Sequence, residues 1–297
     1  MCGSGDQTDV AAESNVDPAR IGALSFASRK PPELMHHRLV RCPGCDTLYA
    51  SPAPDAAALA RGYEHAAFDS AEESRRAAAT YAQLVKRLLP RLPPSGGALD
   101  IGTGDGAFLS ELLELGFDDV VGIEPSVAPV AAASPEVQGR IRPGTFEATD
   151  FDRGRFRLVT AFQVLEHVAD PLELCREAGR LLAPGGALLV VCHDRRSFVN
   201  RVMGSRSPIR DIQHLQLFSR GSLHELLERA GLGRAELSKV TNRYPLRYWL
   251  RLAPLPGRTA VIDLTDRLHL GQVPVSLRVG NLAAVGFLRG RLSAERR

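Results

Sequence analysis

The sequence predicts an α/β protein whose core is a doubly wound, largely parallel sheet. From residue 98 onward, short apolar segments alternate with segments of helical periodicity, as strands and helices do in such a sheet. Residues 187–192 are apolar at almost every position, as buried parallel strands are. A glycine-rich turn joins the first strand to its helix. With 297 residues, 44% of them hydrophobic, the chain is long enough for one sizeable domain and an appendage.

Three regions follow one another along the chain. Residues 1–54 show no clear periodic element, apart from two short strand-like pieces on either side of Cys42-Pro-Gly-Cys45. Residues 55–95 have a helical pattern up to Leu92, and consecutive prolines then end it. Residues 96–297 hold the predicted sheet, with an insertion at about residues 243–280 between its last two strands.

The elements of the sheet region follow from local patterns. A helix over residues 106–115 is expected because Phe108, Leu109 and Leu112 recur at helical spacing and Gly116 ends it. The strands expected are 98–101, 120–123, 157–162, 187–192, 235–240 and 282–287, and the further helices are 171–182 and 222–230.

The turn after the first strand has the form of a ligand-binding loop. It reads DIGTGDG over residues 100–106, where glycines let the backbone approach a ligand that a Cβ would exclude. An anion at Asp100 would repel a pyrophosphate but favours a cationic amino acid or a sulfonium. Glu124, at the end of the second strand, can accept both hydroxyls of a ribose. These features favour S-adenosylmethionine (SAM) over NAD; the alternatives are a nucleotide-binding relic and an oxidoreductase.

With these residues in view, the chain resembles the class I SAM-dependent methyltransferases, and in particular a broad bacterial group with an N-terminal cysteine knuckle. The resemblance covers about residues 38–290. Its matching stretches are ALDIGTGDGAF at 98–108, FQVLEHV at 162–168, LAPGG at 182–186 and HLQLFS at 214–219. The first stretch is specific for the cofactor, and the other three are typical of the fold.

The resemblance implies a Rossmann-like sheet of seven strands with the last strand antiparallel, and a helical lid from residues 55–95. It implies that the turn lies under the methionine part of SAM, that Glu124 binds the ribose, and that Gln163 approaches the methionine end. Phe146 stands where relatives often place an Asp against the adenine, so packing on its ring is expected instead. The cofactor-binding residues expected are Asp100, Gly102, Thr103, Gly104, Glu124, Pro125, Phe146 and Gln163.

Two histidines are candidates for the chemical step. Methyl transfer from a sulfonium is an in-line displacement, and an oxygen acceptor also needs a base to take its proton. His167 and His214 both follow strands that should end at the catalytic edge. Glu166, His167 and His214 also resemble the magnesium ligands of small-RNA 2′-O-methyltransferases, but Gln163 replaces the first Glu, so magnesium is not expected. The alternative is that Glu166 and His167 only cap or orient their loop.

A structural zinc site is a separate hypothesis. Cys42 and Cys45 form half of a four-ligand zinc ribbon, and Cys2 matches one member of the second pair in the resembling group. His36 or His37 would have to complete the site. Bound zinc and a decayed site are both open, and neither would be catalytic.

The region around the acceptor carries two further patterns. Tyr244, Tyr248 and Trp249 give the insertion an aromatic cluster, which would line an apolar acceptor pocket or belong to an amphipathic helix that covers the sheet. Residues 194–210 carry five arginines, which would bind a carboxylate or phosphate of the acceptor or remain solvated.

The function expected from these residues and the resemblance is O-methylation of a small-molecule metabolite, such as a natural product, a glycan or a phenol. One alternative is C- or N-methylation of a sugar or another small molecule. The other is a SAM-binding regulatory protein without catalysis.

Composition and charge argue against some classes of partner and some cellular locations. The formal net charge is only +3, and no basic stripe with interleaved aromatic residues is present, so a nucleic-acid partner is not expected. No apolar run approaches the ~20 residues of a membrane helix, and residues 1–9 lack the regions of a signal peptide. We therefore expect a cytoplasmic protein with a small-molecule acceptor, either a monomer or a homodimer.

Overall fold

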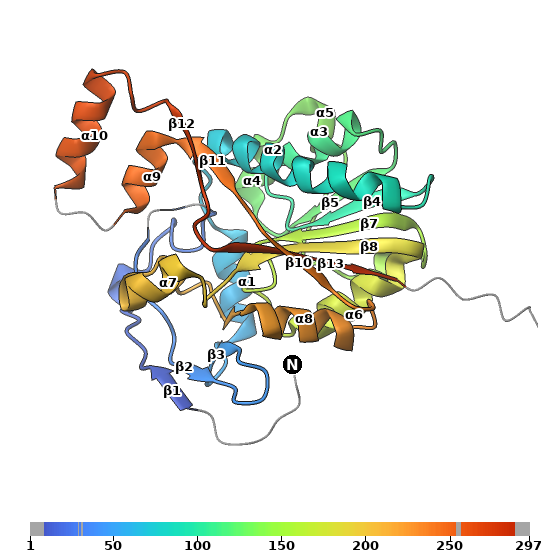
Figure 1. Ribbon diagram of the computed structural model, residues 1–297, viewed down its shortest axis with the longest axis horizontal. Coiled ribbons are helices and arrows are strands. Elements are labelled where there is room, and N and C mark those ends of the chain that lie inside the picture. Colours follow the sequence, from blue (N-terminus) through green and yellow to red (C-terminus); the bar gives the residue numbers. More distant parts are fainter. Residues whose placement is uncertain (1–8, 29, 31, 254–256, 289–297) are drawn as a thin grey trace, which may run out of the picture.

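The computed structural model describes residues 9–28, 30, 32–253 and 257–288. At its centre lies a sheet of seven strands in the order β10-β13-β8-β7-β4-β5-β6 (Figure 1). The strands are β4 Gly97–Ile101, β5 Val120–Glu124, β6 Ile141–Pro143, β7 Phe156–Phe162, β8 Leu182–His193, β10 Glu236–Lys239 and β13 Asn281–Phe287.

The strand directions are those of a Rossmann-like methyltransferase sheet. β4 pairs in parallel with β5 and β7, and the outer pairs β5–β6 and β7–β8 are also parallel. β13 runs antiparallel to both β8 and β10. The predicted seven-stranded, doubly wound sheet with an antiparallel last strand is therefore confirmed.

Helices cover both faces of this sheet. α2 Ala71–Leu88 and α3 Ala107–Glu114 lie on one face, and α6 Pro171–Leu181 and α8 Arg220–Arg229 lie on the other (Figure 1). The side chains of β8 alternate accordingly, because Leu189 and Val191 pack into one core cluster while Val190 and Cys192 pack into the other. This two-sided burial explains why β8 is apolar at successive positions.

The helical pattern of residues 55–92 is not one helix, so that expectation is wrong in part. α1 Ala56–Glu64 begins at Asp55, whose side chain accepts the N–H of Ala58, and α2 begins only at Ala71. Between them the N–H of Ala67 donates to the carbonyl of Ala23 at 2.9 Å. A long-range backbone contact thus replaces the intrahelical hydrogen bond. α2 ends in a 3₁₀ turn, Leu89–Arg91.

The N-terminal segment builds a second, four-stranded sheet in the order β1-β2-β3-β9. β2 Leu39–Arg41 and β3 Leu48–Ala50 are the two strand-like pieces expected around the cysteines, and β1 Asp9–Ala12 pairs with β2. The fourth strand, β9 Gln216–Leu217, comes from the opposite half of the chain and pairs with β3. The N-terminal segment is therefore hydrogen-bonded to the residues that directly follow His214.

The insertion has its own small architecture. β11 Asn242–Pro245 and β12 Pro274–Leu277 form a two-stranded sheet, and α9 Leu246–Leu252 and α10 Arg258–Arg267 connect them. The shorter elements elsewhere are α4 Val127–Ala132, α5 Pro135–Gln138, α7 Phe198–Met203 and the 3₁₀ turns Pro18–Arg20, Ala148–Asp150 and Gly204–Arg206. Within the described part of the chain, no helix is both long and apolar enough to cross a membrane.

Candidate active site

A single cavity of about 1370 Å³ brings most of the expected site residues together. It lies where β4, β5, β7 and β8 end, because its lining includes Ile101, Glu124, Phe162 and His193. Side chains of α1, α2 and the insertion complete the lining. Ligands of open α/β sheets bind at the carboxyl ends of the strands, and this cavity has that position.

The glycine-rich turn forms one wall of the cavity. Gly102 and Gly104 have φ angles of 74° and 61°, which L side chains adopt only with strain. A Cβ on Gly102 would lie 2.6 Å from Val164 Cγ2, whereas a Cβ on Gly104 would meet no described atom within 4 Å. Gly102 thus packs tightly against Val164, while Gly104 faces space that a side chain would fill. The turn fits a ligand that touches its backbone.

Glu124 joins this turn to the end of β5. Its carboxylate accepts the N–H of Gly104 at 2.8 Å and the N–H of Ser126 at 2.9 Å. Burial raises the pKa of this carboxyl, and the hydrogen bonds from Ser126 and Gly104 oppose that rise. Each carboxylate oxygen can still accept another hydrogen bond. The geometry is suited to a ribose diol beside the turn.

Asp100 has a different position from the one expected. Its side chain is 3% exposed and accepts a hydrogen bond from Thr160 Oγ1 at 2.6 Å. Burial raises the pKa of this carboxyl to about 7. The described cavity lining includes Gly102, Thr103 and Gly104 but not Asp100. Asp100 therefore supports the turn from beneath in this structure, and direct contact with SAM stays a prediction.

Gln163 presents a buried amide to the cavity. Its φ is 57°, and its N–H donates to the carbonyl of Val191 at 2.7 Å, which fixes the residue at the end of β7. Neither its Oε1 nor its Nε2 has a hydrogen-bond partner among the described residues. Buried amides are normally satisfied, so this side chain fits a polar ligand such as the amino-acid end of SAM. Pro125 and Phe146 line the same cavity.

Three histidines, His167, His193 and His214, line the same cavity. His167 and His214, both expected from the sequence, have ring centroids 5.0 Å apart. His193, the last residue of β8, adds a third ring whose centroid lies 5.3 Å from that of His214. Sequence reasoning missed His193, although a polar residue that ends an apolar parallel strand is a usable signal.

His214 presents an unprotonated ring nitrogen in the cavity. Its Nδ1 lies 2.7 Å from the carbonyl of Ile209, which only accepts, so Nδ1 carries the proton and Nε2 keeps its lone pair. Burial and the nearby charge of Lys30 lower the pKa of this histidine to about 4, although the hydrogen bond to Ile209 opposes that shift. The imidazole is therefore neutral at neutral pH, and its Nε2 lone pair can accept a hydrogen bond.

His167 is hydrogen-bonded to a residue of helix α1. The hydroxyl of Tyr63, on α1, lies 2.9 Å from His167 Nδ1 and 3.4 Å from the carbonyl of Gln213. Burial lowers the pKa of His167 well below its usual value, and the charges of His214 and His193 add to this. The position of Tyr63 at the cavity follows from how α1 packs.

Glu166 faces the sheet. Its side chain is fully buried, and its Oε1 accepts the backbone N–H of His193 at 2.6 Å. Burial raises the pKa of this carboxyl to about 7. Among the described residues, no three His, Cys, Asp or Glu side chains form a group that could hold a metal ion. The contact with His193 supports the expectation that Glu166 orients its loop.

The cysteine turn holds two buried thiols. Cys42 and Cys45 are 6% and 8% exposed, and Cys45 Sγ lies 3.3 Å from Thr47 Oγ1. Cys2, the third expected zinc ligand, lies outside the described residues. A structural zinc site stays a prediction.

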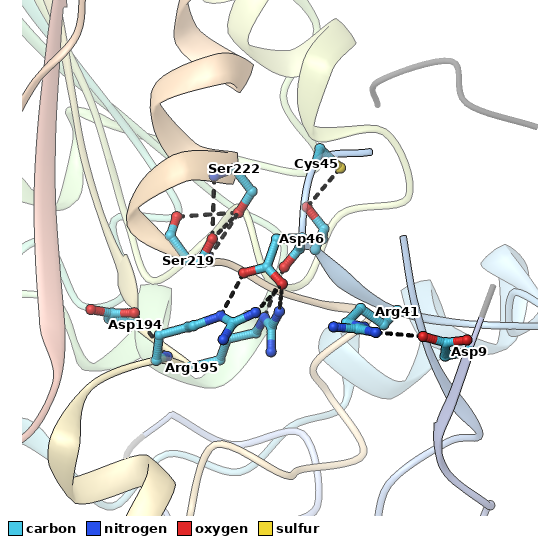
Figure 2. Close-up of polar contacts among 10 residues, drawn as sticks. Asp9, Arg41, Cys45, Asp46, Asp194, Arg195, Ser219 and Ser222 are labelled. Atoms are coloured by element: carbon cyan, nitrogen blue, oxygen red, sulfur yellow. Dashed lines mark hydrogen bonds and ion pairs between the residues drawn. The ribbon is translucent and has the colours of Figure 1, made fainter. Parts of the chain in front are cut away.

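Two of the five arginines expected near the acceptor have a structural partner. Asp46, in the cysteine turn, accepts from both Arg195 and Arg196, with Arg196 Nε at 2.7 Å from Asp46 Oδ2. Figure 2 shows the Asp46 carboxylate facing Arg195, next to Ser219 at the start of α8. These two guanidinium groups connect the N-terminal sheet to the loop after β8, so they are engaged in that contact.

The aromatic cluster of the insertion lines the cavity. Tyr244 and Tyr248 stack with centroids 4.2 Å apart, and Trp249 meets both rings edge-on. Trp249 Nε1 donates to the carbonyl of Val275 on β12 at 3.0 Å, which anchors the indole. All three aromatic side chains belong to the cavity lining. Of the two interpretations given by the sequence, the structure supports an aromatic wall of the pocket.

Comparison with known proteins agrees with this arrangement. A family model described as a methyltransferase domain matches residues 72–235, more than half of the chain. The ubiquinone biosynthesis O-methyltransferase of Caulobacter sp. (strain K31) is 37% identical over 103 residues, which are 33% of this chain and 40% of that protein. The enzyme of the same name from Marinobacter nauticus is 31% identical over 159 residues, 48% of this chain and 66% of that protein.

The chain spans about half the length of the curated relatives that it matches. Among solved structures, a SAM-dependent methyltransferase of Thermotoga maritima is 22% identical, with a TM-score of 0.48 over 73% of this chain and 91% of that one. From the family match over residues 72–235, which agrees with the sheet order, we conclude that the chain belongs to the methyltransferase domain family.

Proposed function

We propose that the chain transfers the methyl group of SAM to an oxygen atom of a small-molecule acceptor. The observation that carries this proposal is the shared cavity, which is lined both by Gly104 and Glu124 and by a neutral His214. The curated relatives named O-methyltransferases support the choice of oxygen.

SAM, when bound, supplies an electrophilic methyl group. The turn, Glu124, Phe146 and Gln163 would hold it, and the three histidines lie on the acceptor side. Nε2 of His214 would take the proton of the acceptor hydroxyl as that oxygen attacks, and the Nδ1–H bond to Ile209 keeps the ring in place. Lid helices α1 and α2 exclude water from the cavity.

The acceptor is expected to be small and partly apolar. The aromatic wall of Tyr244, Tyr248 and Trp249 suits a natural product, a glycan face or a phenol. We also propose that the protein acts in the cytoplasm on free metabolites and does not act on nucleic acid.

The test begins with titration calorimetry. Wild-type protein should bind SAM and S-adenosylhomocysteine, and failure to bind either would refute the proposal. His214→Gln should lower methyl transfer to an acceptor found by labelled-SAM screening of cell extract at least 100-fold, with SAM affinity unchanged. The matched control, His224→Gln on α8, should keep wild-type turnover. Equal turnover in both variants would favour C- or N-methylation without this base.

A further inference from the structure

His193 is the third imidazole of the cavity wall, and the chemical step described above does not use it. It is the last residue of β8, and its ring lies beside that of His214 in the cavity lining. We propose that His193 is a second acceptor-binding residue, and that the acceptor therefore donates two hydrogen bonds, one to each imidazole. This inference rests on the proposed methyl transfer to a small molecule.

Asn281 determines which nitrogen of His193 faces a ligand. The two residues are opposite one another on β8 and β13, and His193 Nδ1 lies 3.0 Å from Asn281 Oδ1. Because a carboxamide oxygen only accepts, Nδ1 carries the ring proton and Nε2 keeps its lone pair. His214 has the same arrangement through Ile209. Both rings thus offer Nε2 as an acceptor to an O–H or N–H donor.

The backbone before Asn281 is held by a close approach to α7. Gly280 has a φ of 97°, and a Cβ there would lie 2.3 Å from Ser197 Oγ and 2.8 Å from Asn200 Nδ2. The carbonyl of Gly280 accepts the N–H of Asp194 at 2.7 Å. The chain that returns from the insertion is therefore packed where it places Asn281 against His193.

The groups that face His193 keep its ring neutral. Burial and repulsion from the protonated form of His214 lower the pKa of His193 to about 3, although Asn281 and Asp211 oppose that shift. Glu166 binds the backbone N–H of His193 and not its ring. A neutral ring accepts at Nε2 from about pH 5 to about pH 8, so both acceptors are present over that range.

The test compares phenol, which has one hydroxyl, with catechol, which has two on neighbouring carbons. Protein saturated with S-adenosylhomocysteine is titrated with each probe. Wild type should bind catechol about fivefold more tightly, as one added neutral hydrogen bond would give. His193→Phe keeps a ring but has no accepting nitrogen, so it should lose this preference and keep its affinity for phenol and S-adenosylhomocysteine. No preference in wild type, or an equal preference in His193→Phe, would overturn the proposal.

Asn281→Asp gives a second, reversible measurement. A carboxylate beside Nδ1–H stabilises the imidazolium, so the pKa of His193 should rise, as NMR titration of the ring can show. The preference for catechol should then fall as the pH drops through the new pKa and return when the pH is raised.

Two results with Asn281→Asp would overturn the proposal. One is a pKa of His193 that does not change, which would contradict the contact with Asn281. The other is a catechol preference that persists when the ring is protonated. Failure of wild type to bind S-adenosylhomocysteine is a different outcome, because it would refute the proposed function itself.

Discussion

At the residue scale, the buried histidines make stability depend on pH. The pKa of His214 is lowered to about 4 in the folded chain, while an unfolded histidine titrates near 6.5. Between these values the unfolded chain binds more protons, so the free energy of unfolding falls as the pH drops, by about 1.4 kcal/mol per pH unit for each such group. His214→Gln should therefore unfold with a shallower dependence between pH 6.5 and pH 4 in urea titrations. An unchanged slope would contradict the burial of a neutral ring.

Glu166 makes the opposite contribution. Its folded pKa is raised to about 7 from 4.5, so the folded chain binds more protons between these values and loses stability as the pH rises through about 7. Glu166→Gln should remove this contribution to the pH dependence of stability, because an amide oxygen does not titrate but can still accept the backbone N–H of His193. Glu166→Ala should cost about 2–3 kcal/mol, because it leaves a cavity and an unpaired N–H. Urea titrations at pH 5 and pH 8 measure both effects, and equal losses in the two variants would count against this role.

At the scale of elements, Asp46 connects two segments 149 residues apart in the chain (Figure 2). Its φ is 60°, a conformation that Asn tolerates, so Asp46→Asn removes charge without straining the turn. The variant should lose about 1 kcal/mol and be cleaved faster by protease within residues 195–210. Asp9→Asn breaks the exposed ion pair to Arg41 and should change neither. Similar cleavage of both variants would show that Asp46 does not hold this loop.

Helix α2 is connected to the glycine-rich turn through one buried hydrogen bond. Ser74 Oγ donates to Asp105 Oδ1 at 2.6 Å, and the same oxygen accepts from the N–H of Ala107 at 3.3 Å. Ser74→Ala should weaken SAM binding severalfold in calorimetry, because Asp105 then fixes the turn less well. Thr80→Ala removes a hydroxyl bonded only locally to Arg76 and should leave affinity unchanged. Equal SAM affinity in the two variants would show that the Ser74–Asp105 hydrogen bond does not contribute to cofactor binding.

The elements differ in how far the sequence predicts them. β4, β5, β7 and β8 follow from local apolar runs, because strands buried on both faces have no polar side to satisfy. The two-residue strand β9 has no such signal, since only its partner β3 defines it. The break before α2 was missed because the hydrogen bond from Ala67 to Ala23 is set by tertiary packing.

At the scale of the whole molecule, one part of the site follows from local sequence and the other part depends on tertiary contacts. Gly104 and Glu124 belong to one strand–turn–helix–strand unit, so their spacing alone indicated a cofactor site. The part of the cavity that carries the histidines comes from distant parts of the chain: Tyr63 contacts His167 across 104 residues, and His193 contacts Asn281 across 88. Only the topology brings these side chains together, so sequence spacing did not reveal them.

Contacts between the N-terminal segment and the loop that carries His214 predict how the chain unfolds. Gln213 Nε2 donates to the carbonyls of Ser25 and Ala27 at 3.0 and 3.1 Å, and Lys30 Nζ lies 3.2 Å from Asp211. With the β3–β9 pairing, these contacts join residues 1–54 to the loop that carries His214. We therefore expect one calorimetric transition for the whole chain, with calorimetric and van't Hoff enthalpies equal.

Gln213→Ala tests this coupling directly, because it leaves two buried carbonyls without their shared donor. The loss should be about 2 kcal/mol, and the single transition should move to lower temperature as a whole. His214 follows Gln213 in the chain, so methyl transfer should fall together with stability. The opposite outcome is two separate transitions, with the N-terminal sheet unfolding first and methyl transfer retained. It would show that residues 1–54 form an independent unit beside the methyltransferase domain.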